Sequence, residues 1–300
     1  MTVVASFSIK GGVGKTTTAV NLAHIAASKG LRTLLWDLDP QGAASFYLKA
    51  RPSADFEKSL ADDIKQLARY VLPSTFANLD VIPIRFSNRR LNEVLTSGES
   101  SSRRLKAMLF PLLSNYDLVV LDCPPGVSAL ANNALHAADL TLVPTIPTPL
   151  SVRTLRQLRR HLKNEQLETK LLAFFCMQDV RRSMHRSIVE YHQQLNGDDM
   201  LSTVIPYSVI IERMGIKRKP LSVYAGASPA AAAYASLFEE LSPLLQRAHA
   251  DTVQTDGAAA LKVDRLGGRQ PMNQRPTISK RPKVFHARRK VRPVRFDSRE

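Results

Sequence analysis

The stretch "FSIKGGVGKTTTAVNLAHIAASKG", residues 7–30, decides the fold. Its first residues end a short apolar, β-rich run, residues 2–9. Its last part, residues 16–29, would place alanine and leucine on one face of a helix that ends at Gly30. The first pattern predicts a buried strand and the second predicts a helix. A glycine-rich loop between a strand and a helix binds phosphate, because successive backbone N–H groups and the helix N-terminus converge there.

The residues of this loop match the chemistry of a triphosphate site. Gly11, Gly12 and Gly14 let the backbone approach phosphate oxygens without an intervening Cβ atom. Lys15 is placed to reach the β- and γ-phosphates, and Thr16 is placed to offer its hydroxyl to Mg²⁺. The loop therefore predicts an ATP-binding site that requires Mg²⁺.

Two features depart from the common pattern G-x-x-x-x-G-K-[ST]. Ile9 stands where that pattern has its first glycine, and a second lysine, Lys10, precedes the glycines. A lysine at the start of the loop has room to point away from the phosphates that the loop itself binds.

Carboxylates follow two further predicted strands. Asp37 and Asp39 lie in "WDLDPQG", residues 36–42, directly after a strand, and Asp122 ends the apolar strand in "YDLVVLDCPPG", residues 116–126. Parallel strands bring their carboxyl ends to one edge of the sheet, where such folds bind ligands. A carboxylate at the end of this third strand is placed to hold Mg²⁺ directly or through water.

Together these segments resemble the ParA/MinD family of deviant Walker A ATPases. "KGGVGKTT" resembles the deviant Walker A motif, "DLDPQG" is similar to the family's D-x-D-P-Q-G segment, and "DCPP" is similar to its D-x-P-P segment. The resemblance implies an ATPase that is slow without a stimulating partner. It also implies a homodimer with ATP between the subunits, in which Lys10 crosses to the partner's nucleotide and Asp39 orients or activates the attacking water.

The resemblance and the loop chemistry define an expected set of site residues. The expected catalytic residues are Lys10, Lys15 and Asp39. The expected metal site consists of Thr16, Asp37 and Asp122. The expected nucleotide-binding residues are Gly11, Gly12, Val13, Gly14, Lys15, Thr16, Thr17, Gln41 and Pro206.

Strand and helix patterns alternate along most of the chain. The strands are apolar runs, which favours a doubly wound α/β domain with a mostly parallel sheet and helices on both faces, a P-loop NTPase. The predicted strands cover residues 2–9, 31–37, 79–84, 116–125, 139–147, 170–178 and 200–207. The predicted helices cover residues 16–29, 58–72, 89–97, 131–138, 150–163 and 229–248.

The composition divides the chain into an ATPase domain, residues 1–250, and a tail, residues 251–300. The 300-residue chain carries a net charge of +16, and the part from Leu261 onward contributes +10 of it. Prolines and arginines without apolar periodicity predict that the tail is disordered. It is expected either to anchor the protein to a polyanion or to act as a solubilising appendage.

The positive charge favours nonspecific, salt-sensitive binding to DNA phosphates. The expected contacts are Arg213, Lys217, Arg218 and Lys219, in a block similar to the region that binds DNA in relatives. A second candidate is a basic stripe on the predicted helix 150–163, formed by Arg153, Arg156, Arg160 and Lys163. Either set is also compatible with a solvated surface.

These observations predict a partition or positioning ATPase in the cytoplasm, associated with the nucleoid and stimulated by a ParB-like or other cargo adaptor. The alternative is a MinD-like membrane-cycling ATPase, which is disfavoured because the tail is interrupted by prolines and poor in large apolar residues. No apolar run is long enough to span a membrane, and no signal peptide pattern begins the chain. Cys123 and Cys176, each in an apolar run, indicate a reducing compartment.

Overall fold

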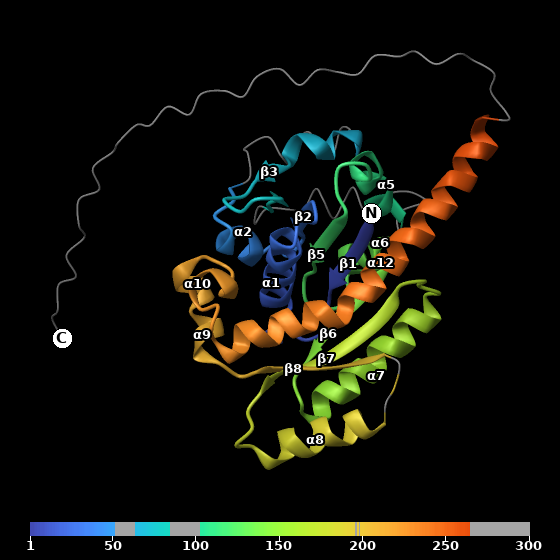
Figure 1. The fold of residues 1–300 in the computed structure, drawn as a ribbon. Coiled ribbons are helices and arrows are strands. Elements are labelled where there is room, and N and C mark those ends of the chain that lie inside the picture. The colour runs from blue at the N-terminus through green and yellow to red at the C-terminus, as the bar shows by residue number, and fades with distance from the viewer. Residues whose placement is uncertain (52–63, 85–102, 196, 198, 265–300) are drawn as a thin grey trace, which may run out of the picture. The chain divides into compact units, whose positions relative to one another are not determined.

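The computed structural model describes residues 1–51, 64–84, 103–195, 197 and 199–264. Met1–Gly257 form one compact unit (Figure 1). The second unit, Ala258–Glu300, is described only as far as Asp264. The helix predicted over residues 89–97, and most of the tail, fall outside the described residues.

One eight-stranded sheet forms the centre of the first unit, in the order β3-β4-β2-β5-β1-β6-β7-β8. In this sheet β3 pairs antiparallel with β4, and the other pairings are parallel. The predicted mostly parallel sheet is therefore confirmed. The strands are β1 (Thr2–Ser6), β2 (Thr33–Asp37), β3 (Leu72–Pro73), β4 (Leu79–Ile82), β5 (Leu118–Asp122), β6 (Leu140–Thr145), β7 (Lys170–Gln178) and β8 (Met200–Pro206).

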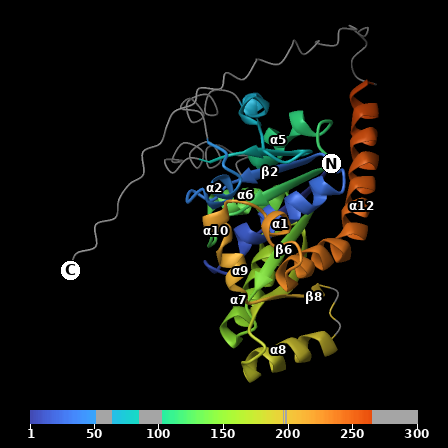
Figure 2. The same ribbon diagram turned by 60° about the vertical axis from the view of Figure 1, so that its left-hand side comes forward.

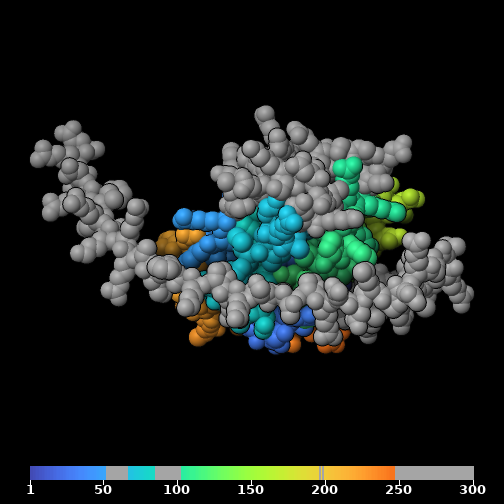
Figure 3. Space-filling view, turned by 90° about the horizontal axis from the view of Figure 1, so that it is seen from above, coloured from blue at the N-terminus to red at the C-terminus, as the bar shows by residue number. Residues whose placement is uncertain are grey.

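Helices cover both faces of this sheet. Along β1, Val3 and Ala5 belong to a core cluster that includes Leu105 and Leu155, whereas Val4 belongs to the cluster on the other face. The first face is covered by η1 (Ile64–Tyr70), α5 (Arg104–Leu109), η3 (Phe110–Leu112), α6 (Ala129–Ala137) and α7 (Pro149–Asn164). The second face is covered by α1 (Lys15–Ser28), α2 (Ala43–Tyr47) and residues 230–245 of α12 (Pro229–Asp264). Figure 3 shows the cyan segment that contains η1 beside the green segment that contains α5, and these two helices are in contact.

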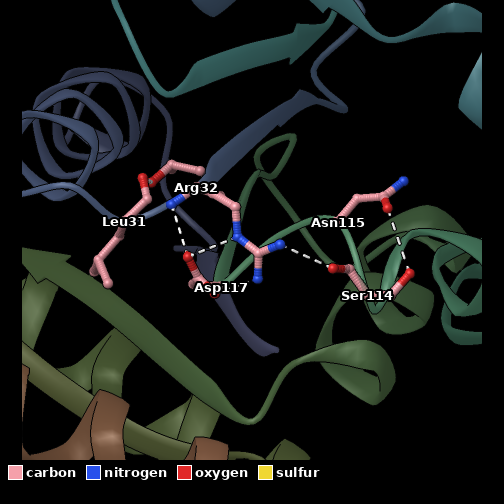
Figure 4. Close-up of polar contacts among 6 residues, drawn as sticks. Leu31, Arg32, Ser114, Asn115 and Asp117 are labelled. Atoms are coloured by element: carbon pink, nitrogen blue, oxygen red, sulfur yellow. Dashed lines mark hydrogen bonds and ion pairs between the residues drawn. The ribbon is translucent and has the colours of Figure 1, made fainter. Parts of the chain in front are cut away.

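An ion pair at the amino end of the sheet helps to set the register of β2 and β5. The Arg32 guanidinium donates to both carboxylate oxygens of Asp117, at 2.6 and 3.1 Å, and to the Ser114 carbonyl at 2.9 Å (Figure 4). The backbone N–H of Arg32 also donates to Asp117. With these ends tied together, Asp37 at the end of β2 lies opposite Asp122 at the end of β5.

Short helices that the sequence patterns did not indicate fill the loops around this framework. α8 (Ser183–Gln194) connects β7 to β8, and α9 (Val209–Glu212), α10 (Met214–Lys217) and α11 (Leu221–Tyr224) connect β8 to α12. α8 has an apolar seam that is narrow, with His185 and Val189 as its buried residues. A seam of this width gives a weak periodic signal.

The last helix continues beyond the expected end of the domain. The pattern predicts a helix over residues 229–248, and α12 extends to Asp264. The predicted start of the tail, residue 251, falls within α12, and residues 265–300 lie outside the described part of the chain.

Candidate functional site

The glycine-rich loop joins β1 to α1 as expected from its residues. Gly12 and Gly14 have φ angles of +71° and +93°, in the left-handed region that glycine adopts without steric cost. A Cβ atom at either position would meet nothing within 4 Å, so the backbone conformation is what requires glycine. Gly14 is the N-cap of α1 and supplies no side chain to its N–H groups. These donors are left to bind an anion.

Lys15 places its ammonium in the same region. Its side chain is buried, and its Nζ atom donates to the carbonyl of Lys10 at 3.5 Å. Burial lowers the pKa of Lys15, while the nearby Asp122 and Asp39 carboxylates act in the opposite direction. The site therefore combines a buried cation with carboxylates, the arrangement that a phosphate–metal complex requires.

Asp122 is the carboxylate best suited to a metal ion. It is fully buried, and neither oxygen has a hydrogen-bonding partner of normal geometry among the described residues. Burial raises the pKa of Asp122 well above its usual range, and the Thr16 hydroxyl opposes this rise. An unpartnered buried carboxylate beside a threonine hydroxyl fits a hard cation such as Mg²⁺.

The described residues contain no cluster of three His, Cys, Asp or Glu arranged to hold a metal ion. Mg²⁺ in nucleotide sites takes one or two protein ligands and completes its octahedron with phosphate oxygens and water. The pair Thr16 and Asp122 is compatible with such a site, and its binding of Mg²⁺ stays a prediction.

Asp37 and Asp39 organise the turn that follows β2. Asp37 accepts hydrogen bonds from the Ser45 backbone N–H at 2.7 Å, the Ser45 hydroxyl at 2.6 Å and the Asp39 N–H at 3.2 Å. Burial raises the pKa of Asp37 to about 6. Asp39 accepts from the Gln41 N–H at 3.0 Å. Asp37 thus holds the start of α2 in place, and its expected metal contact stays a prediction.

A cavity of about 330 Å³ lies between the loop, this turn and the end of β8. Asp39 lines it, as do most of the residues expected to bind nucleotide: Gly11, Gly12, Gly14, Lys15, Thr16, Thr17, Gln41 and Pro206. Val13 is buried and does not line it; its carbonyl instead accepts from the Cys176 thiol at 2.9 Å. The cavity has the size of a small-molecule site.

Other residues complete the cavity without having been expected from the sequence. Tyr47, Met177, Tyr207 and Tyr234 come from four separate segments. Met177 has a φ of +55°, an unusual backbone conformation for this side chain within a strand. Their separation along the chain leaves no local pattern that could have identified them.

The ammonium group of Lys10 lies in different surroundings from that of Lys15. Its Nζ atom donates to the Ser151 hydroxyl on α7 at 3.4 Å. It lines a small separate hollow with Val143 and Leu155, and it does not line the 330 Å³ cavity. The two lysines of the loop therefore point in different directions.

The basic residues expected to contact DNA differ from one another in their surroundings. Arg213, Lys217 and Lys219 are exposed, whereas Arg218 is half-buried against Phe46. The basic stripe of α7 is exposed along its length, at Arg153, Arg156, Arg160 and Lys163. Within the described part of the chain, no helix is long and apolar enough to cross a membrane.

Comparison with known proteins agrees with this geometry. Residues 1–172 match a family model described as an AAA domain. The sporulation initiation inhibitor protein Soj of Bacillus subtilis is 33% identical over 248 residues, which cover 80% of this chain and 98% of Soj. The chromosome-partitioning ATPase Soj of Treponema pallidum is 32% identical over 238 residues, covering 77% of this chain and 93% of that protein.

A solved structure shares the fold. The ATP complex of a McdA variant from Cyanothece superposes with a TM-score of 0.71 at 23% identity, over 81% of this chain and 96% of McdA. The family match over more than half of the chain, the identity to Soj and the P-loop geometry lead to one assignment: this chain belongs to the ParA/Soj/MinD family of P-loop ATPases.

Proposed function

We propose that this protein is an ATP-switched dimer that binds nucleoid DNA nonspecifically and partitions or positions a cargo. The observation that carries the proposal is the direction of Lys10. Its ammonium lies on α7, outside the cavity of its own subunit, although it begins the phosphate loop. A lysine so placed is free to serve the nucleotide of a second subunit, where it would act like an arginine finger.

The residues of the cavity divide the chemistry of hydrolysis among them. Lys15 and the N–H groups of the loop bind the phosphates of ATP, and Asp39 orients the attacking water. Thr16, which lines the cavity, and Asp122, buried near it, would hold Mg²⁺, and the ion would supply positive charge to the phosphates of ATP. Catalysis then rests on positioning and electrostatics, as in other P-loop enzymes.

Binding to DNA follows from the basic surface. Arg213, Lys217 and Lys219 are exposed cations on one segment, and they suit phosphate contacts that carry no base specificity. A dimer doubles such a patch, so ATP binding strengthens the attachment to DNA. A cargo-bound, ParB-like adaptor would stimulate hydrolysis and release the protein from the nucleoid.

Co-sedimentation with random-sequence DNA tests the switch. The full chain and a form ending at Asp264 are measured with ATP, with ADP and without nucleotide. We expect binding by the shorter form to require ATP, and to weaken steeply with salt. Equal binding in all three states would contradict the proposal. ATP-dependent binding to anionic lipid vesicles in place of DNA would instead support the membrane-cycling alternative.

Lys10→Ala tests the dimer. We expect the variant to bind ATP within about threefold of the wild type, since Lys10 lies outside the cavity, but to lose dimerisation in sedimentation equilibrium and about 10³-fold in stimulated hydrolysis. Lys170→Ala removes an exposed lysine from the start of β7 and serves as the control. A Lys10→Ala protein that dimerises normally with ATP would show that the role of this lysine is misassigned.

A further inference from the structure

Arg218 adopts a backbone conformation that an arginine rarely takes. Its φ and ψ angles are +50° and +52°, and it ends α10, donating its N–H to the Met214 carbonyl at 2.7 Å. Glycine is the residue that adopts this left-handed helix end without steric cost. Strain of this kind persists where the surrounding structure holds the residue in place, and it gathers at functional positions. The conformation of Arg218 is therefore a reason to consider the contacts of its side chain.

That side chain is half-buried and contacts α2. Its Nε atom donates to the Phe46 carbonyl at 2.9 Å, and its guanidinium carbon lies 4.3 Å from the centroid of the Phe46 ring. α2 and α10 lie side by side (Figure 1, Figure 2). Gly215 of α10 lies beside the Tyr47 ring of α2, which a Cβ atom at this position would approach to 4.0 Å, an ordinary van der Waals distance.

The segment that carries Arg218 is itself fastened to the phosphate-loop helix. Asn21, buried on α1, accepts from the Leu221 N–H at 2.8 Å and donates to the Met214 sulfur at 3.4 Å. Asn21 also donates to the Thr17 carbonyl at 2.8 Å. Arg218 thus reaches α2 from a segment held at both ends by α1.

α2 also borders the nucleotide cavity. Asp39 and Gln41, in the turn before α2, line that cavity, and so do Ala43 and Tyr47 of α2 itself. The helix has five residues and is held at its start by the bonds from Ser45 to Asp37. The contact with Arg218 holds its other end.

We infer that Arg218 is a positioning residue for hydrolysis, and not a contact to DNA phosphate. By holding the end of α2 it keeps the turn at residues 37–42, and with it the Asp39 carboxylate, in place over the nucleotide. The inference rests on the proposed function in one respect, the assignment of Asp39 as the residue that orients water. It replaces the expectation that Arg218 acts in the same way as Lys217 and Lys219.

Arg218→Gly separates this role from simple structural support. Glycine suits the left-handed conformation, so we expect an unchanged or higher melting temperature, while the contact with Phe46 is lost. With saturating ATP and no DNA, we expect kcat to fall about tenfold, with the ATP dissociation constant within about twofold of the wild type. The measurements are phosphate release and the binding of a fluorescent ATP analogue.

Two further variants keep the test independent of a single substitution. Arg218→Lys keeps the charge but lacks the planar guanidinium, so we expect it to be nearly as slow as Arg218→Gly. Phe46→Leu removes the stacked ring and keeps the carbonyl that accepts from Arg218, so we expect a smaller fall in kcat. Lys170→Ala, an exposed lysine at the start of β7, is the control, and we expect it to retain the wild-type kcat without DNA.

The outcomes distinguish this inference from the proposed function. An Arg218→Gly protein with wild-type kcat, but with a DNA-binding salt dependence lowered like that of Lys217→Ala, would overturn the inference. Asp39→Asn, which keeps an oxygen to accept from Gln41, is measured alongside. Wild-type hydrolysis by Asp39→Asn would contradict the proposed role of Asp39. A slow Asp39→Asn together with a fast Arg218→Gly would overturn the inference alone.

Discussion

The nucleotide cavity and the basic segment at residues 213–219 both adjoin α2, and they differ in how their charges are held. At the cavity, Lys15 and Asp39 line the space and Asp122 lies buried nearby, and both carboxylates act on the pKa of Lys15. On the basic segment, three of the four cations are exposed and one, Arg218, packs on Phe46. Buried charges must be matched to a partner or a ligand, whereas exposed charges carry little information about their role.

Asp122→Asn gives the sharpest test of the buried charges at the nucleotide cavity. We expect hydrolysis to fall about 10²–10³-fold, because the amide binds Mg²⁺ poorly. The same change should stabilise the nucleotide-free protein by about 1–3 kcal/mol at neutral pH, because the carboxylate is buried without a partner. Denaturant unfolding and phosphate release measure the two effects.

The sign of the pH dependence follows from the raised pKa of Asp122. The unfolded chain ionises this group at a lower pH than the folded chain does, so ionisation destabilises the fold as pH rises. The extra stability that Asp122→Asn gives to the nucleotide-free protein should therefore become smaller as pH falls and Asp122 becomes protonated. If the stability difference between Asp122→Asn and the wild type grew towards low pH, the assignment of Asp122 as a buried, unpartnered carboxylate would be contradicted.

Asn21→Ala tests the connection between the two regions. The substitution leaves the buried Leu221 N–H without an acceptor, and we expect the free energy of unfolding to fall by about 1–3 kcal/mol. Ser28→Ala, at an exposed site on the same helix, should change it by less than about 0.5 kcal/mol. Equal effects of the two substitutions would show that α1 does not hold the basic segment.

Lys219→Ala should have the smallest effect of these substitutions, because it changes only an exposed cation of the basic segment. We expect stability and hydrolysis without DNA to be unchanged, and the slope of log affinity for DNA against log salt to decrease by about one. Filter binding at several salt concentrations measures it. An unchanged slope would remove Lys219 from the surface that binds DNA.

Much of the fold could be predicted because its signals are local. The strands that became β1, β2, β5, β6 and β7 are apolar runs, and each appears within a few residues of its predicted position. The narrow seam of α8 and the short helices α9–α11 were missed, since their positions depend on contacts with distant segments. The length of α12 likewise exceeded what its apolar pattern indicated.

The sequence by itself determined the P-loop, the parallel sheet and the carboxylates at its edge, because glycine conformations, strand periodicity and chain order specify them locally. Only the tertiary structure decided that Asp37 holds α2 while Asp122 stays unpartnered, and that Lys10 turns to Ser151. It also separated Arg218 from its basic neighbours. The physical reason is that the partner of a charged side chain depends on which distant segments fold against it.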